Sequence, residues 1–293
     1  MRRAVYRLLI AASLLPFSSP APAAPAQVTG VQPPAWVEHA GQRIALRAGA
    51  TLEATDVLET GKGGRLQVAL ADGSTLKVGE NARVALKELD IPATGGTMRG
   101  FLDVLRGAFR FTTAAAQKAL RRDVDVRIAS VIVGIRGTDI WGRSNSEADL
   151  VCLIEGDISV EHPAAGRLAM REPLTFFVAP KNAPPKPIGL VAPDKLALWA
   201  AETEFERGGG LLLPDGGWAV QLGVHVDVQQ AERMARRLRD AGYPVELEAA
   251  ETGGRRYQRV RLVGFDTQAD AKAFAKRIAG RHGVARPRVT PRQ

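Results

Sequence analysis

The chain has 293 residues, more than one average domain, so two folded units with connectors are expected. Its 45% apolar and 24% charged residues are ordinary for globular protein and exclude long disorder outside the connectors. The net charge of +9 is unevenly placed, because residues 217–293 carry 15 Lys and Arg against 8 Asp and Glu while the middle of the chain is close to neutral. A basic C-terminal unit implies an anionic partner, which charge alone leaves open as nucleic acid, lipid or acidic polysaccharide.

Residues 1–26 have the composition of a secretory signal peptide. Three arginines precede a short apolar run that ends at Leu15, and small residues follow it. Cleavage after Ala23 or after Ala26 fits the A-x-A rule. A retained membrane anchor is the alternative, but about 20 apolar residues are needed to span a bilayer and this run is far shorter. The sequence therefore predicts an exported, periplasmic protein without a transmembrane segment after cleavage.

Residues 36–178 predict an all-β domain that follows a Pro-containing lead-in over 27–35. Short segments alternate polar and apolar residues at period two, which is typical of half-buried strands. The expected strands are Gln42–Leu46, Arg65–Leu70, Ser74–Val78, Ala82–Leu86, Phe101–Leu105, Val124–Ile128, Asp149–Ile154 and Ile158–Glu161. Hairpins are predicted at Ala71–Ser74 and Gly156–Asp157, where glycine accepts a positive φ. One helical insertion is predicted over Thr113–Arg122.

A Pro-rich linker is predicted over 179–216. Within it, Asp194 is the expected N-cap of a helix over 195–207 that has one apolar stripe. Gly208–Gly210 ends this helix, and a second joint with Pro and Gly at 214–217 precedes the basic unit. The two folded units are therefore expected to be joined by an extended connector.

An internal repeat organises the C-terminal unit, 217–293. Val220–Leu222 recurs forty positions later as Val260–Leu262, and the apolar positions of the following segment recur with the same spacing. Each copy has a strand at period two, then a helix at period 3.6, then a second strand. The second strand is Val245–Ala249 in the first copy and Arg286–Thr290 in the second. Two such copies make a βαββαβ arrangement, in which a four-stranded antiparallel sheet carries both helices on one face. The predicted fold class is multidomain, with an all-β unit followed by this α+β unit.

Strand alternation defines the face of this sheet that the helices leave open. Val220 and Leu222 point toward the helices, as do Val260 and Leu262 of the third strand, which we expect beside the first at the centre of the sheet. The outward residues are then Ala219, Gln221, Gly223, Tyr257, Arg259, Arg261, Arg286 and Arg288. A merely solvated polar face is the simpler explanation. Arginines on neighbouring central strands repel each other, however, so the pattern favours a binding surface.

Two segments carry a resemblance to a known family. Trp218–Gly223 (WAVQLG) and Tyr257–Leu262 (YQRVRL), the latter followed by Phe265, resemble the SPOR domain (sporulation-related repeat) over about 217–291. The resemblance implies binding to septal peptidoglycan, preferentially to glycan strands stripped of stem peptides, through the helix-free face and its first-strand glutamine. The glycan-binding residues predicted from the resemblance and the alternation together are Gln221, Tyr257, Arg259, Arg261, Arg286 and Arg288.

The sequence departs from the family pattern at the rim of this face. Val263–Gly264 stands where the family usually has Gly-Pro, and Val224–His225 stands where a small residue and an aromatic are common. Both differences alter the edge of the groove, so they bear on affinity and selectivity rather than on fold.

The chemistry of a stripped glycan strand suits this face. Every second sugar keeps a lactyl carboxylate, to which arginine offers forked donors, while Gln221 can donate to and accept from hydroxyls. Tyr257 offers a flat apolar surface to a pyranose ring. RNA-binding sheets of the same topology are the alternative, but they stack bases on several aromatics, and here only Tyr257 is aromatic. With the export signal, this leaves nucleic acid as an unexpected partner.

The β unit carries a second resemblance. Its most distinctive segment is Gly134–Gly142 (GIRGTDIWG), with further similarity in Asp56–Gly61, Ala69–Ser74 and Ile154–Gly156. Together they resemble the FecR domain over about 45–165. In iron-uptake signalling that family also has a cytoplasmic anti-sigma segment and a membrane helix, whereas this chain begins with a leader, so sigma-factor control is not implied. Arg136, Thr138 and Asp139 are equally open to a structural role in a turn and to contact with a partner.

No catalytic or cofactor-binding pattern is present. His39, His162, His225 and His282 are scattered singly, without the spacing of a metal site. Cys152 is the only cysteine and lies among aliphatic residues, so a buried thiol is expected rather than a disulfide or a reactive group. The acid pair Glu246 and Glu248 alternates along one strand and is expected to be solvated. We therefore expect no cofactor and no enzyme activity.

These observations predict a periplasmic cell-envelope adaptor. The SPOR-like domain is expected to hold it on peptidoglycan, with possible enrichment at the division septum, while the FecR-like domain meets an envelope partner that the sequence does not identify. A signalling receptor tethered to the wall is the alternative. A wall hydrolase is a third option, for which the raised-pKa carboxylic acid that glycan cleavage needs is not indicated by any motif.

Overall fold

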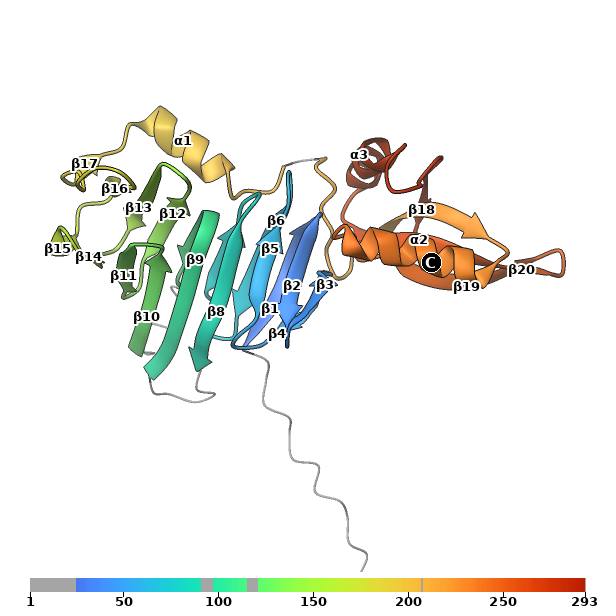
Figure 1. Cartoon of the computed structure of the whole chain (residues 1–293), viewed down its shortest axis with the longest axis horizontal. Helices are drawn as coiled ribbons and strands as arrows, with labels where there is room; N and C mark the ends of the chain where they lie inside the picture. The colour runs from blue at the N-terminus through green and yellow to red at the C-terminus, as the bar shows by residue number, and fades with distance from the viewer. Residues whose placement is uncertain (1–24, 91–96, 115–120, 207, 293) are drawn as a thin grey trace, which may run out of the picture.

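The computed structural model describes residues 25–90, 97–114, 121–206 and 208–292. It contains a unit made of strands and, at the other end of the long axis, a smaller unit of strands and helices (Figure 1). The predicted fold class, an all-β unit followed by an α+β unit, is confirmed.

The β unit consists of two sheets, here called A and B. In spatial order, sheet A contains β4 (Thr51–Leu52), β1 (Ala26–Gln32), β6 (Arg65–Leu70), β7 (Thr75–Val78), β9 (Thr97–Thr112), β12 (Asp139–Ser144), β13 (Ala148–Glu155), β16 (Thr175–Pro180) and β17 (Gly189–Leu190). Sheet B contains β3 (Gln42–Ala45), β2 (Ala35–His39), β5 (Val57–Thr60), β8 (Arg83–Asp90), β9, β10 (Arg121–Ile128), β11 (Val131–Ile135), β14 (Ile158–His162) and β15 (Gly166–Met170). Neighbouring strands are antiparallel except β9 and β10.

The long strand β9 belongs to both sheets. Its first part pairs with β8 and β10 of sheet B, and its last part pairs with β7 and β12 of sheet A. Gly107 lies at the change of sheet with φ +88°, and a Cβ there would collide with Ala82, so only glycine fits the bend. The inner faces share one apolar core, to which Val68 of sheet A and Val84 and Val126 of sheet B contribute fully buried side chains.

The segment 27–35, predicted as a lead-in, is part of this core instead. Residues Ala26–Gln32 form β1, which pairs with β6, and Val28 and Val31 are fully buried. A bulge between Val28 and Gly30 shifts the alternation by one residue. That shift conceals the period of two from which a strand is predicted.

The two predicted hairpins have different outcomes. Ala71–Ser74 joins the paired strands β6 and β7, as predicted. Gly156–Asp157 does not make a hairpin, because β13 lies in sheet A and β14 in sheet B, and the chain crosses between the sheets there. The predicted helix over Thr113–Arg122 falls mainly on residues 115–120, which lie outside the described residues, and its last two residues belong to β10.

The helix of the connector is shorter and begins earlier than predicted. It is α1 (Pro193–Ala201), with Ala192 as N-cap and no side-chain cap, so Asp194 lies in the first turn instead of at the N-cap. A proline in the first turn has no N–H that needs a partner, and its fixed φ suits a helix, so the helix can begin here without a capping side chain. Beyond Ala201 the chain leaves the helix and lies on sheet A.

The connector is packed rather than loose. We call residues 193–206 and 208–212 the strap, which follows the β unit toward the α+β unit (Figure 1). Its Trp199 stacks on Trp141 of β12, with ring centroids 5.0 Å apart and planes 2° from parallel. Beyond the helix, Glu202 binds Arg143 at 2.7 Å.

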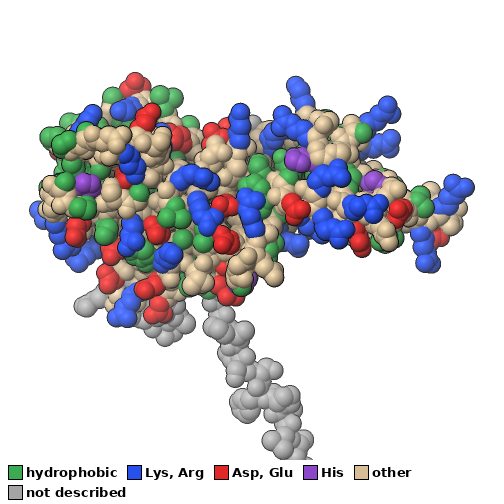
Figure 2. Space-filling view, viewed as in Figure 1, with side chains coloured by type: hydrophobic (Ala, Val, Ile, Leu, Met, Phe, Trp, Pro, Cys, Tyr) green, Lys and Arg blue, Asp and Glu red, His purple; other side chains and the backbone are tan. Residues whose placement is uncertain are grey.

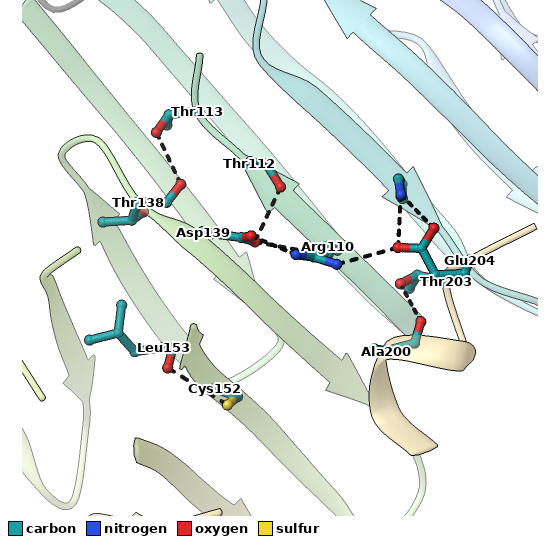
Figure 3. A network of polar contacts seen from close by, with 11 residues as sticks. Arg110, Thr112, Thr113, Thr138, Asp139, Cys152, Leu153, Ala200, Thr203 and Glu204 are labelled. Carbon is teal, nitrogen blue, oxygen red and sulfur yellow. Dashed lines mark hydrogen bonds and ion pairs between the residues drawn. The ribbon is translucent and has the colours of Figure 1, made fainter. Parts of the chain in front are cut away.

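Two further glutamates continue the strap across sheet A. Glu204 accepts hydrogen bonds from Lys77 at 2.6 and 2.8 Å and from Arg110 at 3.3 Å (Figure 3). Glu206 binds Arg65 at 3.0 Å. Every second residue from 202 to 206 therefore pairs with a cation of a different part of the sheet, which fixes this segment on it.

The C-terminal unit has the predicted βαββαβ order. Its elements are β18 (Trp218–His225), α2 (Val228–Asp240), β19 (Glu246–Thr252), β20 (Arg255–Phe265), α3 (Gln268–Ile278) and β21 (Arg288–Pro291). The strand order is β19-β20-β18-β21, all antiparallel, so the first and third strands are central as expected. Asp227 and Thr267 cap the two helices with their side chains. The fourth strand begins at Arg288, two residues later than predicted.

The two units are in contact. The indole nitrogen of Trp36 in β2 donates to the carbonyl of Asp240 at the end of α2, at 3.1 Å. The adjacent Gly242 packs against the same ring, where a Cβ would lie 2.7 Å from it. Leu212 of the strap exchanges backbone hydrogen bonds of 3.0 and 2.7 Å with Val31 of β1. The end of α2 and the strap together therefore attach the C-terminal unit to the β unit.

Candidate functional site

The helices cover one face of the C-terminal sheet. Val220 and Leu222 of β18 and Leu262 of β20 are buried in a cluster that includes Met234 of α2 and Phe274 of α3. Residues that alternate with them face the other way. We call that side the open face.

Gln221 lies at the centre of the open face. It is directly opposite Arg261 of β20 on one side and Arg288 of β21 on the other, and Arg261 is in turn opposite Glu246 of β19. Directly opposite residues of an antiparallel pair share a face, so these four side chains form one row across the sheet. Gln221 is half-buried and is covered by no helix.

Arg261 is the member of the predicted site that the structure corrects. It is only 6% exposed, where the sequence predicts an accessible flanking residue. Its guanidinium binds Glu248 at 2.6 Å, which supplies the charge partner that a buried arginine requires. Arg261 therefore forms part of the floor of the open face instead of projecting from it.

Glu248 was not expected to take part in the site. The sequence predicts that Glu246 and Glu248 are both solvated, and this is wrong for Glu248, which is one third exposed and also lies 3.8 Å from Arg259. Glu246 is exposed, as predicted. The alternation of the acids along β19 was visible in the sequence, but the register that sets Glu248 against two arginines was not.

Tyr257 and Arg259 lie together beside this row. The Tyr257 hydroxyl contacts Thr252 at 2.9 Å and accepts a hydrogen bond from Arg259 at 3.0 Å. The hydrogen bond with Thr252, followed by that from Arg259, lowers the pKa of Tyr257. These two contacts hold the half-buried ring in one orientation.

Arg286 and Arg288 are the free cations of the open face. Both are exposed, and neither makes a hydrogen bond or ion pair with a described residue. Arg288 lies in β21 opposite Gln221, whereas Arg286 precedes the strand. The structure therefore brings together Gln221, Arg288, Arg259 and Tyr257, with Arg261 beneath them and Arg286 at the margin.

A β-bulge changes the rim of the face. The sequence predicts Gly223 outward, but the pairing of β18 with β20 shifts between Gln221 and Gly223. A Cβ on Gly223 would lie 2.7 Å from the sulfur of Met234, so this residue faces α2. Val224 takes the open side opposite Arg259 and is 49% exposed. Ala219 of the same strand, which is also predicted to face outward, is fully buried.

Positive charge is not confined to the open face. Figure 2 shows Lys and Arg side chains gathered over the C-terminal unit on the side of α2. The exposed arginines of that helix are Arg233, Arg236, Arg237 and Arg239. The basic composition therefore gives a long-range attraction to anions from several directions.

The distinctive segment of the β unit has a structural role at Asp139. Its carboxylate accepts two hydrogen bonds from Arg110, at 3.0 and 2.7 Å, and one from Thr112 at 3.1 Å (Figure 3). The carbonyl of Thr138 accepts from Thr113. Arg136 differs from these two residues, since it is exposed and has no hydrogen bond or ion pair with a described residue.

Cys152 is fully buried, as predicted, and burial raises the pKa of its thiol to about 12. His39 contacts the carboxylate of Asp56 at 2.7 Å, which raises the pKa of the histidine. Within the described ranges, no group of three His, Cys, Asp or Glu side chains could hold a metal ion. No helix in the same ranges is long and apolar enough to cross a bilayer.

The protein is thus modular: a two-sheet β domain is joined to a βαββαβ domain that has an open polar face. Residues 56–159 match the family model described as FecR protein, and residues 214–286 match the SPOR domain. The chain combines a FecR domain with a C-terminal SPOR domain, as the sequence predicts. It is an envelope-associated protein with a peptidoglycan-binding domain.

Solved structures give a more distant similarity. Two crystal structures of a putative anti-sigma factor from Parabacteroides distasonis align with TM-scores of 0.40. The first is 15% identical and covers 49% of this chain and 64% of the other, just under two thirds of its length. The second is 12% identical and covers 76% and 89%. No curated protein matches the chain.

Proposed function

We propose that this protein is an exported, non-catalytic adaptor that binds peptidoglycan glycan strands lacking stem peptides through the open face of its SPOR domain. The observation that carries the proposal is the position of Gln221, between Arg261 and Arg288 on a helix-free face. The FecR domain then presents a second binding surface to the periplasm.

The contacts divide between recognition and support. Arg288, Arg286 and the outer part of Arg259 are available to lactyl carboxylates, which stem peptides would convert to uncharged amides. Gln221 is available to sugar hydroxyls, since its amide can both donate and accept. The pair of Arg261 and Glu248 keeps the floor in place. Stem peptides would also obstruct approach to a nearly flat sheet.

Processing of the leader is part of the proposal. Ala26 is the first residue of β1, is 2% exposed and pairs with Leu52 and Leu70. Cleavage after Ala26 would remove the start of this strand, whereas cleavage after Ala23 leaves it whole. We therefore favour Ala23 as the last residue of the leader.

Binding without cleavage agrees with the carboxylate chemistry of the open face. Glycan hydrolysis requires a carboxylic acid that can give a proton to the leaving oxygen. The carboxylate of Glu248 is occupied by the guanidinium groups of Arg259 and Arg261. Glu246 is exposed to water at the margin of the sheet.

The experiment is co-sedimentation of the full chain with purified sacculi before and after amidase treatment. We expect stronger retention on sacculi that have lost their stem peptides, and a loss of retention for Gln221→Lys. Arg233→Gln, which removes an exposed charge on the helix side, is the matched control and should still sediment. Equal or weaker binding after amidase, or normal binding by Gln221→Lys, would contradict the assignment. Release of soluble muropeptides would show a hydrolase instead.

A wall-tethered signalling receptor is the second candidate. The contact of Trp36 with the end of α2, together with the strap, favours it, because two docked domains can transmit a change from one to the other. Removal of residues 217–293 distinguishes the two roles. An adaptor then loses its localisation but keeps its partner, whereas a receptor also loses the response of that partner to the wall.

A further inference from the structure

A groove crosses the outer face of sheet B, in a part of the FecR domain that is distant in sequence from the SPOR domain. It has a volume of about 300 Å³ and is formed by β10, β11, β14 and β15. Val124, Val133 and Val160 of these strands are buried in the core, so the residues that alternate with them point outward. Nothing in the proposed glycan site uses this surface.

Small side chains form the floor of the groove. Asp125, Gly134, Ser159 and Ala169 are opposite one another in successive strands and so form one row. A Cβ on Gly134 would lie 2.6 Å from the hydroxyl oxygen of Ser159 and 3.4 Å from a carboxylate oxygen of Asp125. Two oxygens therefore converge above a position that only glycine leaves open, within the distinctive segment of the FecR domain.

Charged residues of both signs line the groove. They are Asp123, Asp125, Asp157, Arg136, Arg167 and Arg171. None of them makes a hydrogen bond or ion pair with a described residue. Elsewhere in this domain, arginines such as Arg83 and Arg143 reach a carboxylate within 2.7 Å. The charges of the groove therefore have no close partner within the fold, although Arg167 lies near enough to Asp125 to favour its charged form.

We propose that this groove binds a short peptide that carries both a free amine and a free carboxylate. The ammonium group would lie over Asp125 and Ser159, where two acceptors converge, and the carboxylate would be held by Arg136, Arg167 or Arg171. Partial burial raises the pKa of Asp125, followed in effect by the nearby Asp123, so an ammonium group there would relieve an unfavourable environment.

The mixed signs select against other ligands. A polyanion such as nucleic acid would be repelled by the three aspartates, and a neutral sugar would offer no charge to the aspartates and arginines of the groove. Stem peptides of the wall have the required amine and carboxylates close together. The identification of stem peptides as the ligand rests on the proposed location in the envelope. The chemistry of the ligand, an amine and a carboxylate close together, is inferred from the groove alone.

The test uses isothermal titration of the full chain with the free tetrapeptide that amidase releases from sacculi. We expect a dissociation constant of about 1 mM or lower, which is reasonable for a small polar ligand. Asp125→Asn and Arg167→Gln should each weaken binding at least tenfold, and so should acetylation of the peptide amine. Lys87→Gln, an exposed position on β8 of the same sheet, is the matched control and should bind normally.

The outcomes separate this site from the open face. No binding by the wild type, or equal binding by Asp125→Asn and by the acetylated peptide, would overturn the proposal. Gln221→Lys should bind the tetrapeptide normally while it loses glycan, and the groove variants should still sediment with peptide-free sacculi. Unchanged melting temperatures confirm that each variant is folded. If the wild-type chain binds the tetrapeptide but does not sediment with peptide-free sacculi, the proposed function is refuted and the groove proposal is unaffected.

Discussion

Trp199→Ala should release the strap from sheet A without unfolding the domain beneath it. The Trp199 ring is 5% exposed, stacks on Trp141 and meets the edge of Phe176 with centroids 5.6 Å apart. A buried tryptophan removes about 200 Å² of surface from water, which corresponds to about 5 kcal/mol at 25 cal/mol per Å². Measured costs of Trp→Ala in cores are about 3–5 kcal/mol. A loss of about 3 kcal/mol would raise the population of the open strap roughly 100-fold.

Hydrogen exchange followed by mass spectrometry measures this opening directly. Peptides that contain Glu202 to Glu206 should exchange about 100-fold faster in Trp199→Ala, while peptides from β6 and β7 should be unchanged. Leu198→Ala is the control, because Leu198 is 70% exposed on the same helix and should change exchange by less than about twofold. Equal exchange in the wild type and in Trp199→Ala would refute the conclusion that the stacked pair holds the strap.

Three other substitutions test the site and its surroundings. Glu248→Gln should lower the free energy of unfolding by about 1–3 kcal/mol in urea titration, because it leaves the buried Arg261 without its charge partner. Gly223→Val should cost a similar 1–3 kcal/mol by overpacking against α2, in contrast to a Val224→Thr control. His39 should titrate above its ordinary value in NMR, since its hydrogen bond with Asp56 raises the pKa. The pair then contributes its full stability at a pH below the pKa of His39 in the unfolded chain, and this stability is lost as the pH rises through the pKa of His39 in the folded protein. Asp56→Asn should abolish both the raised pKa and this pH dependence.

The C-terminal domain could be predicted almost completely because its signals are local and occur twice. Val220–Leu222 and Val260–Leu262 fix the parity of the two central strands, and the helices that follow have an unbroken period of 3.6. The same parity fails at Gly223, where a bulge inserts one residue. A bulge depends on the neighbouring strand, so no property of the segment itself reveals it.

The parts that could not be predicted depend on contacts between distant segments. Glu248 meets Arg261 only because of the register of β19 with β20. Glu204 and Lys77 are 127 residues apart in the chain. The alternating glutamates of the strap are visible in the sequence, but their partners are not, so the sequence predicts an extended connector without its contacts to sheet A. The same reasoning applies to β1, whose partner β6 is separated from it by four strands in the chain.

The arrangement of the two domains has a consequence for function. The end of α2 contacts β2, and the strap reaches β1, so the attachment uses the helix side and the start of the SPOR domain. The open face takes no part in these contacts. The proposed binding of a glycan strand is therefore compatible with an unchanged contact between the two domains.

NMR mapping of the full chain with soluble, peptide-free glycan tests most simply whether the open face binds glycan. We expect the largest chemical-shift changes on β18, β20 and β21, around Gln221, Arg259 and Arg288, with small changes on α2 and α3. Changes centred on the exposed arginines of α2, with Gln221 unaffected, would contradict it.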